Sequence, residues 1–141
     1  MYSTIVVGTD GSETASRAVT VAADLARRTG AVLHLVKAFS LNVGAGQTAG
    51  LVASDTAETF EQLAEEADDT LKEAEGTLEG ITVERHAAPG PPADRIVAVA
   101  EEVHADLIVV GSRGMHRRVL GSVPNSVAHN APCTVLIVKT T

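Results

Sequence analysis

Five short apolar runs alternate along the chain with four stretches of helical periodicity, and this alternation limits the possible folds more than any other feature. The apolar runs cover residues 3–7, 32–39, 81–87, 107–110 and 135–138. The helical stretches begin after Ser12, at Asp55, at the Pro91-Pro92 pair and at Ser122. Strands separated by such helices pair in parallel, because a parallel neighbour requires a long crossover connection. The sequence therefore predicts an α/β fold, a doubly wound five-stranded parallel sheet with helices on both faces, in a single domain of residues 1–141.

Residues at the ends of these stretches indicate where the elements stop. Ser12 is a good N-cap for the first helix, and Gly30 supplies its end. The second helix is expected to end at Gly80. Residues 40–54 are rich in Gly, Ala, Ser and Thr and are predicted to form a flexible connection. The run 81–87 alternates apolar with polar residues, which is typical of a half-exposed edge strand.

Composition excludes several classes of partner. Only 2% of the residues are aromatic and the formal net charge is −7, which argues against nucleic-acid binding by stacking or by a basic face. No apolar run approaches the roughly 18 residues of a membrane span, and no signal peptide fits before the first strand, so no membrane partner is expected. The single cysteine, Cys133, rules out an intrachain disulfide. We expect Cys133 to be a buried small hydrophobic residue in a reduced, cytoplasmic protein.

Two loops that contain glycine follow predicted strands. The first is Gly8-Thr9-Asp10-Gly11-Ser12, and the second, residues 111–122, contains Arg113, Arg117 and Arg118. In doubly wound folds, ligands bind outside the carboxyl ends of strands, where the strand order reverses. Glycine lets backbone N–H groups approach an anion, and the N-terminus of a following helix favours negative charge. The loops therefore predict a phosphate site, although such turns also serve as plain strand-to-helix connections in which an aspartate bonds only its own backbone.

Other well-known sites lack support in the sequence. The second loop does not start with the Gly-x-Gly of a Rossmann fingerprint, and the chain contains no Gly-Lys-Ser/Thr of a Walker A loop. His34 and His86 lie on predicted strands and His104 and His129 near helix ends, and we interpret all four as structural or surface residues. No Cys/His cluster has the spacing of a metal site. The sequence therefore predicts no catalytic residues.

Four segments resemble the universal stress protein family, and together they extend over essentially the whole chain. They are Ile-Val-Val-Gly-Thr-Asp-Gly-Ser at 5–12, Asp-Leu-Ile-Val-Val-Gly-Ser-Arg-Gly-Met at 106–115, Leu-Gly-Ser-Val-Pro-Asn-Ser-Val at 120–127 and Ala-Pro-Cys-Thr-Val-Leu-Ile-Val at 131–138. Nucleotide-binding members of this family carry Gly, two residues, Gly, nine residues, Gly and then Ser or Thr. Here six residues separate Gly114 from Gly121, so the loop is three residues shorter than that pattern.

The resemblance implies a Rossmann-like, adenine nucleotide alpha hydrolase-like sheet with strand order 3-2-1-4-5. It also implies an adenine nucleotide, ATP or AMP, as ligand. The backbone of Ala38 would then read the adenine edge, and Asp10 would lie near the ribose and phosphates. Asp10 and Ser122 are the residues that would face a nucleotide-bound Mg²⁺. The full set of implied site residues is Thr9, Asp10, Ala38, Val110, Gly111, Arg113, Gly114, Gly121, Ser122 and Val123.

The resemblance further implies a homodimer through residues 134–139, which begin with Thr134 and end with Lys139. A physical reason supports it, because an apolar edge strand is exposed unless another strand pairs with it. Three functions remain open. The favoured one is an ATP- or AMP-binding regulatory module of the stress response. The others are a slow ATPase, for which no base to orient water is visible, and a dimeric interaction scaffold that binds no nucleotide.

Overall fold

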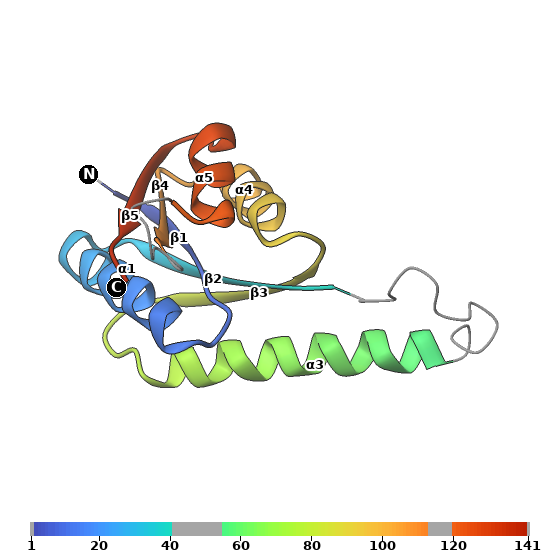
Figure 1. The fold of residues 1–141 in the computed structure, drawn as a ribbon. Coiled ribbons are helices and arrows are strands. Elements are labelled where there is room, and N and C mark those ends of the chain that lie inside the picture. The colour runs from blue at the N-terminus through green and yellow to red at the C-terminus, as the bar shows by residue number, and fades with distance from the viewer. Residues whose placement is uncertain (1, 41–54, 113–119, 141) are drawn as a thin grey trace.

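The computed structural model describes residues 2–40, 55–112 and 120–140 of the chain (Figure 1). The predicted connection at 40–54 and the arginine-containing loop therefore lie largely outside the described residues. The elements in chain order are β1 (Thr4–Gly8), α1 (Glu13–Thr29), β2 (Val32–Phe39), α3 (Asp55–Gly76), β3 (Val83–Pro89), α4 (Pro92–Glu102), β4 (Leu107–Gly111), α5 (Ser122–Asn130) and β5 (Thr134–Val138).

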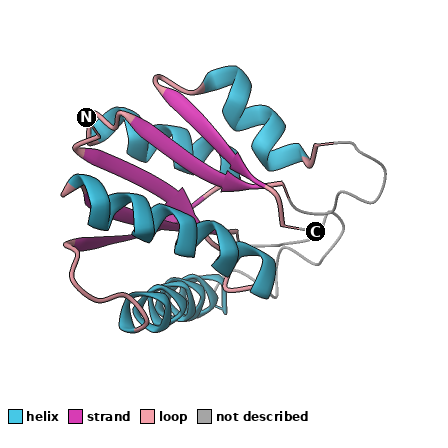
Figure 2. Cartoon of the chain, turned by 90° about the vertical axis from the view of Figure 1, so that its left-hand side faces the viewer, coloured by secondary structure: helices cyan, strands magenta, loops and turns pink. Residues whose placement is uncertain are grey.

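All five strands pair in parallel, in the order β3-β2-β1-β4-β5. The predicted fold class and strand order are confirmed. Helices α1 and α3 cover one face of the sheet and α4 and α5 cover the other, as Figure 2 shows. Strand β1 pairs with β2 on one side and with β4 on the other. The strand order therefore reverses between β1 and β4.

The central strand explains why the first apolar run has no polar positions. Ile5, Val6 and Val7 are all fully buried. Ile5 and Val7 pack with α1 and α3, whereas Val6 packs with α4 and α5. A strand that is covered on both faces needs apolar side chains at every position. By contrast β3 lies at the edge of the sheet, and most of its residues are exposed or half-buried, as its alternating sequence predicted.

The predicted ends of α1 are both confirmed. The Ser12 hydroxyl accepts a hydrogen bond from the Ala15 amide at 3.1 Å, and so satisfies one of the free N–H groups of the first turn. Gly30 has a φ of +77° and donates its N–H to the Ala26 carbonyl at 2.8 Å. Glycine adopts this left-handed conformation without steric cost, which is why the helix ends there.

The boundary between α3 and β3 differs from the prediction. Helix α3 ends at Gly76 and not at Gly80, and β3 begins at Val83, two residues later than expected. The Thr77 hydroxyl and amide both donate to the Ala74 carbonyl, which closes the last turn of the helix. Gly80 has a φ of +77° and belongs to the turn that follows. A positive-φ glycine therefore marks this connection without marking the end of the helix.

Candidate functional site

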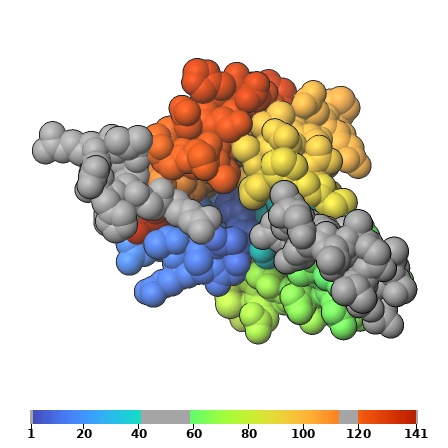
Figure 3. Space-filling model, turned by 45° about the vertical axis from the view of Figure 1, so that its right-hand side comes forward, coloured from blue at the N-terminus to red at the C-terminus, as the bar shows by residue number. Residues whose placement is uncertain are grey.

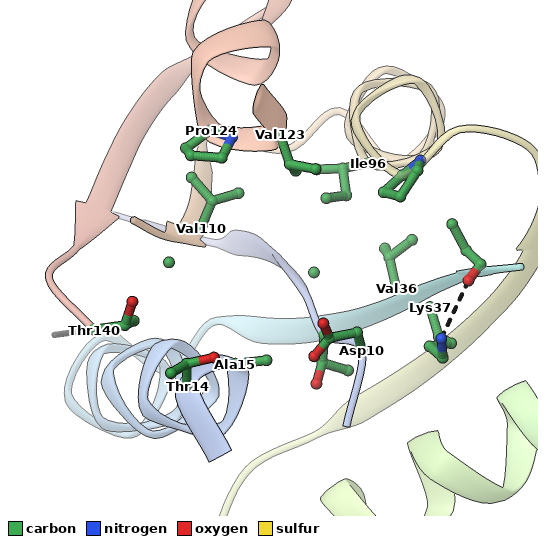
Figure 4. A pocket seen from close by; sticks show the side chains of 15 residues that line it. Asp10, Thr14, Ala15, Val36, Lys37, Ile96, Val110, Val123, Pro124 and Thr140 are labelled. Atoms are coloured by element: carbon green, nitrogen blue, oxygen red, sulfur yellow. Dashed lines mark hydrogen bonds between the residues drawn. The ribbon is translucent and has the colours of Figure 1, made fainter. Parts of the chain in front are cut away.

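A pocket opens at the carboxyl ends of β1, β2 and β4, where the strand order reverses. Side chains from α4 and α5 form its upper wall and the start of α1 forms its lower wall (Figure 4). On the surface, α4 and α5 lie side by side at this end of the molecule (Figure 3). The lining residues are Gly8, Thr9, Asp10, Thr14, Ala15, Val36, Lys37, Ala38, Pro92, Ile96, Val110, Gly111, Val123, Pro124 and Thr140.

Six of the ten predicted site residues line this one pocket. They come from four separate parts of the chain and are Thr9, Asp10, Ala38, Val110, Gly111 and Val123. Gly121 and Ser122 lie immediately before Val123, at the start of α5. Arg113 and Gly114 lie outside the described residues. The sequence motifs thus converge on the switch point of the sheet, where this class of fold binds ligands.

The loop after β1 is held by its own polar groups. The Thr9 amide donates to the Val36 carbonyl at 2.9 Å, and the Gly11 amide donates to the Thr9 hydroxyl at 3.1 Å. One carboxylate oxygen of Asp10 accepts from the Ser12 amide at 2.9 Å. Asp10 is therefore a turn residue, as one of the two interpretations of the sequence proposed. It is also exposed and lines the pocket.

The backbone of Ala38 faces the pocket because of the hydrogen-bond alternation along β2. In a strand, the N–H and C=O of one residue point to the same neighbour, and those of the next residue point to the other. The Val36 carbonyl accepts from Thr9, beyond β1, and the Phe39 carbonyl accepts from Gly90, beyond β3. Ala38 therefore directs its N–H and C=O toward the β1 side. Because β1 ends at Gly8, opposite Val36, both groups point into the space beyond it.

At two glycines of the pocket, atoms of neighbouring residues already occupy the space that a side chain would need. A Cβ at Gly8 would overlap Ile96 of α4, and a Cβ at Gly111 would lie 2.9 Å from the Thr140 methyl group. Thr140 is buried, and its amide donates to the Ser112 hydroxyl at 3.1 Å. The segment after β5 thus returns over the end of β4 and forms one wall of the pocket.

Helix α5 begins at Ser122, where the sequence predicted a helical stretch to begin. Gly121 is the N-cap residue, and no side chain caps the helix, so Ser122 is the first helical residue and its hydroxyl does not serve as the cap. Its side chain is exposed. Val123 and Pro124 of the first turn line the pocket, so the N-terminus of α5 lies beside it, and the helix dipole favours an anionic group near this end.

Lys37, Ile96, Pro124 and Thr140 were not predicted as site residues. Lys37 is the only lysine among the lining residues, and its ammonium group donates to the Ala38 carbonyl at 3.4 Å (Figure 4). Its position directly before Ala38 was the one signal that could have pointed to it. Pro124 directly follows the predicted Val123. Ile96 and Thr140 come from elements that the sequence does not place beside the glycine loops, so packing alone brings those two residues here.

Several groups lie apart from the pocket. His34 is buried and its Nδ1 lies 2.8 Å from Nε2 of His86 on β3, so both have the structural role expected. Cys133 is half-buried against the core beside α4 and α5, and burial raises the pKa of its thiol. Within the described ranges, no three His, Cys, Asp or Glu side chains gather as a metal site requires, and no helix is long and apolar enough to cross a membrane.

A doubly wound parallel sheet, with a pocket at its switch point flanked by glycine loops and a helix N-terminus, defines the Rossmann-like class of α/β proteins. Residues 1–139 match the sequence model of the universal stress protein family. The chain belongs to this family.

Three relatives illustrate the similarity. The chain is 36% identical to the universal stress protein Rv1636 of Mycobacterium tuberculosis, over 99% of this chain and 98% of that protein. A crystal structure of a universal stress protein in complex with cAMP is 36% identical, with a TM-score of 0.67 and coverage of 99% and 98%. The universal stress protein from Archaeoglobus fulgidus in complex with dAMP is 31% identical, with a TM-score of 0.61 and 98% of each chain covered.

Proposed function

We propose that this protein is a regulatory module of the stress response that binds an adenine nucleotide, ATP or AMP, in the pocket at the switch point. One observation carries the proposal: the N–H and C=O of Ala38 point together into the pocket from the end of β2. A donor and an acceptor in this order complement N1 and the 6-amino group of adenine. The solved relatives in complex with cAMP and dAMP support an adenine nucleotide as the ligand.

The remaining site residues have roles that follow from their places. Val110 and Gly111 form the floor on which the ribose would lie, and Asp10 and Thr9 face it from the loop after β1. The phosphates would lie toward Gly121, Ser122 and Val123, with Arg113 and Gly114 completing the cradle. The Asp10 carboxylate and the Ser122 hydroxyl are oxygen donors of the kind that Mg²⁺ accepts beside phosphate oxygens and waters, so these two residues would face a nucleotide-bound Mg²⁺.

Calorimetric titration of protein freed of nucleotide tests the proposal. ATP, AMP and cAMP should each be tried at high protein concentration, and heat of binding is expected for at least one of ATP and AMP. Gly121→Leu should abolish this binding, because its side chain would fill the start of α5 beside the phosphates. Gly76→Leu is the matched control, since an added side chain at Gly76 meets no atom within 4 Å. Absence of heat with every adenine nucleotide would exclude the proposed function.

We also propose that the protein forms a homodimer through β5 and the residue after it, 134–139. Leu136 and Ile137 are each 37% exposed on this edge strand. The Ser112 amide donates to the Val138 carbonyl, so the alternation directs the N–H of Ile137 away from β4 and toward a strand outside. Proline has no N–H and is tolerated where that group faces outward on an edge strand.

Light scattering of the wild type and of Ile137→Pro tests this dimer. The variant should be monomeric while it keeps its fold by circular dichroism. Ile137→Val, which retains the N–H, should remain dimeric. A monomeric wild type at micromolar concentration would contradict the proposal. A dimer is compatible with both the nucleotide module and the nucleotide-free scaffold, and only the titration separates those two.

We also propose a reduced cytoplasmic setting for the protein, as its single cysteine suggested. The half-buried thiol of Cys133 is consistent with this setting.

A further inference from the structure

Ser112 is the first residue after β4, and it is buried although it is polar. It is 2% exposed and is not among the described residues that line the pocket. Its amide donates to the Val138 carbonyl of β5 at 2.8 Å, and its hydroxyl accepts a hydrogen bond from the Thr140 amide at 3.1 Å. Its carbonyl accepts a longer hydrogen bond, of 3.4 Å, from the amide of Gly121, the N-cap residue of α5. One buried residue thus joins the end of β4, the segment after β5 and the start of α5.

Thr140, whose amide bonds to the Ser112 hydroxyl, forms part of the pocket wall. Figure 4 shows Thr140 in the segment after β5, on the same side of the pocket as Thr14 at the start of α1. Its methyl group occupies the side-chain position that Gly111 lacks, so it lies against a residue on which the ribose would rest. Thr140 is 3% exposed, and its carbonyl accepts a hydrogen bond from the Arg17 guanidinium at 3.3 Å. Hydrogen bonds at both its amide and its carbonyl therefore hold the backbone that carries this wall.

We infer that Ser112 is a positioning residue of the nucleotide site, and that its hydroxyl acts on the ligand by holding Thr140 against Gly111. The inference rests on the proposed function. Lys139 and Thr140 belong to no helix or strand, so their positions depend on individual hydrogen bonds. Without the Ser112 hydroxyl, the buried Thr140 amide would lose this acceptor, which is unfavourable, and we expect the segment to leave its position beside the pocket. A ligand binds more tightly where the wall is already ordered, so loss of this wall should weaken binding.

A simpler role for Ser112 is stabilisation of the fold alone. Its hydroxyl would then satisfy the Thr140 amide, and removal of the hydroxyl would lower Tm while the folded protein kept its affinity for the nucleotide. A positioning role also lowers the affinity at temperatures far below Tm, and that loss depends on the side chain of Thr140. The two roles can therefore be separated by titrating the folded variants and by combining substitutions at the two residues.

The experiment titrates AMP and ATP into the wild type, Ser112→Ala, Thr140→Ala and the variant that carries both substitutions. Ser112→Cys is a second variant at the same position, because a thiol resembles the hydroxyl in shape and is only a weak acceptor. Thr29→Val is the control for loss of a hydroxyl elsewhere, since Thr29 bonds the Leu25 carbonyl at 2.7 Å in the last turn of α1, whereas the first turn of that helix lines the pocket. Circular dichroism and a thermal melt establish that each variant is folded at the temperature of the titration.

Thr140→Ala should bind the nucleotide about fourfold more weakly than the wild type, as expected for the loss of one methyl-sized contact. Ser112→Ala and Ser112→Cys should weaken binding at least as much. The double variant should bind no more weakly than Ser112→Ala, because a displaced segment carries its side chain away from the pocket, and Thr29→Val should bind as the wild type does. Unchanged affinity in both Ser112 variants, or additive effects in the double variant, would overturn the inference while the proposed function stands. If the wild type binds neither AMP nor ATP, the proposed function and this inference fail together.

Discussion

Replacing Gly8 by alanine tests why a glycine ends the central strand. The added methyl group would overlap Cδ1 of Ile96 and lie 3.1 Å from its Cγ1. Ile96 is 4% exposed and belongs to the cluster packed beneath α4 and α5. Overpacking in a core costs about 1–3 kcal/mol. Gly8 does not have a positive φ, so alanine fits the backbone and recovers about 0.4–1 kcal/mol by restricting the unfolded chain.

The expected net effect of Gly8→Ala is a destabilisation of about 1 kcal/mol, because the overlapping atom is the end of a side chain and not backbone. In a domain of this size, that lowers Tm by about 2–4 °C. Gly76→Ala is the matched control with the opposite sign. Gly76 is the last residue of α3, and nothing lies within 4 Å of an added methyl group, so we expect a stabilisation of up to about 1 kcal/mol.

Urea unfolding of a double-mutant cycle gives the decisive measurement. Ile96→Val alone should cost about 0.5–1.5 kcal/mol through the methyl group it removes. Combined with Gly8→Ala, it also removes the overlapping Cδ1. The double variant should therefore be more stable than the sum of the single effects predicts, by about 1 kcal/mol. Additive effects, or destabilisation by both glycine substitutions, would refute the explanation that α4 occupies the side-chain position of Gly8.

Two further predictions concern stability. Burial lowers the pKa of His34, the neighbouring His86 lowers it further and Glu84 partly opposes them, so the unfolded chain binds more protons than the folded one. The contribution of His34 to the free energy of unfolding should therefore be constant above about pH 6.5 and fall as the pH drops below it, and urea titrations of His34→Leu should show a flatter profile in that pH range. Ser12→Ala should cost about 1 kcal/mol in the same assay through loss of the cap on α1, and Ser12→Asp should restore most of it, whereas equal stability of Ser12→Ala and the wild type would contradict the cap.

The order and direction of the strands could be predicted because their causes are local. The run at Ile5, Val6 and Val7 has no polar position, and only a strand covered on both faces has that requirement. The caps at Ser12 and Gly30 act through bonds to residues three or four positions away, so their signals are complete within a short window of sequence. Helices between the strands then leave parallel pairing as the solution.

The α3–β3 boundary could not be predicted from the same kind of signal. Ile81 and Val83 alternate as strand residues do, but Ile81 lies in the turn and packs against the core cluster beneath α1 and α3. An apolar side chain can reach a core from a turn as well as from a strand. The alternation therefore extended two residues beyond the strand, and tertiary packing decided where the strand begins.

The residues of the pocket likewise divide into those that the sequence predicts and those that it does not. The glycine loops and Ala38 were found because they follow the ends of strands, where a doubly wound sheet binds its ligand. Ile96 and Thr140 were not found, because their places depend on how α4 and the segment after β5 lie over the sheet. A sequence pattern can indicate the end of the sheet at which a site forms. It does not identify the residues that distant elements contribute to the walls of that site.

The glycines show how far motif evidence reaches. Gly111 suggested close approach of a ligand, yet the Thr140 methyl group already occupies the position of its missing side chain. A glycine required by packing would be present whether or not a nucleotide binds, so Gly111 does not by itself distinguish a binding module from a scaffold. The direction of the Ala38 N–H and C=O has no such packing explanation, because both groups point to the side of β1, and β1 ends before it reaches them. The base end of the pocket therefore carries more of the argument for nucleotide binding than the glycine that first drew attention to it.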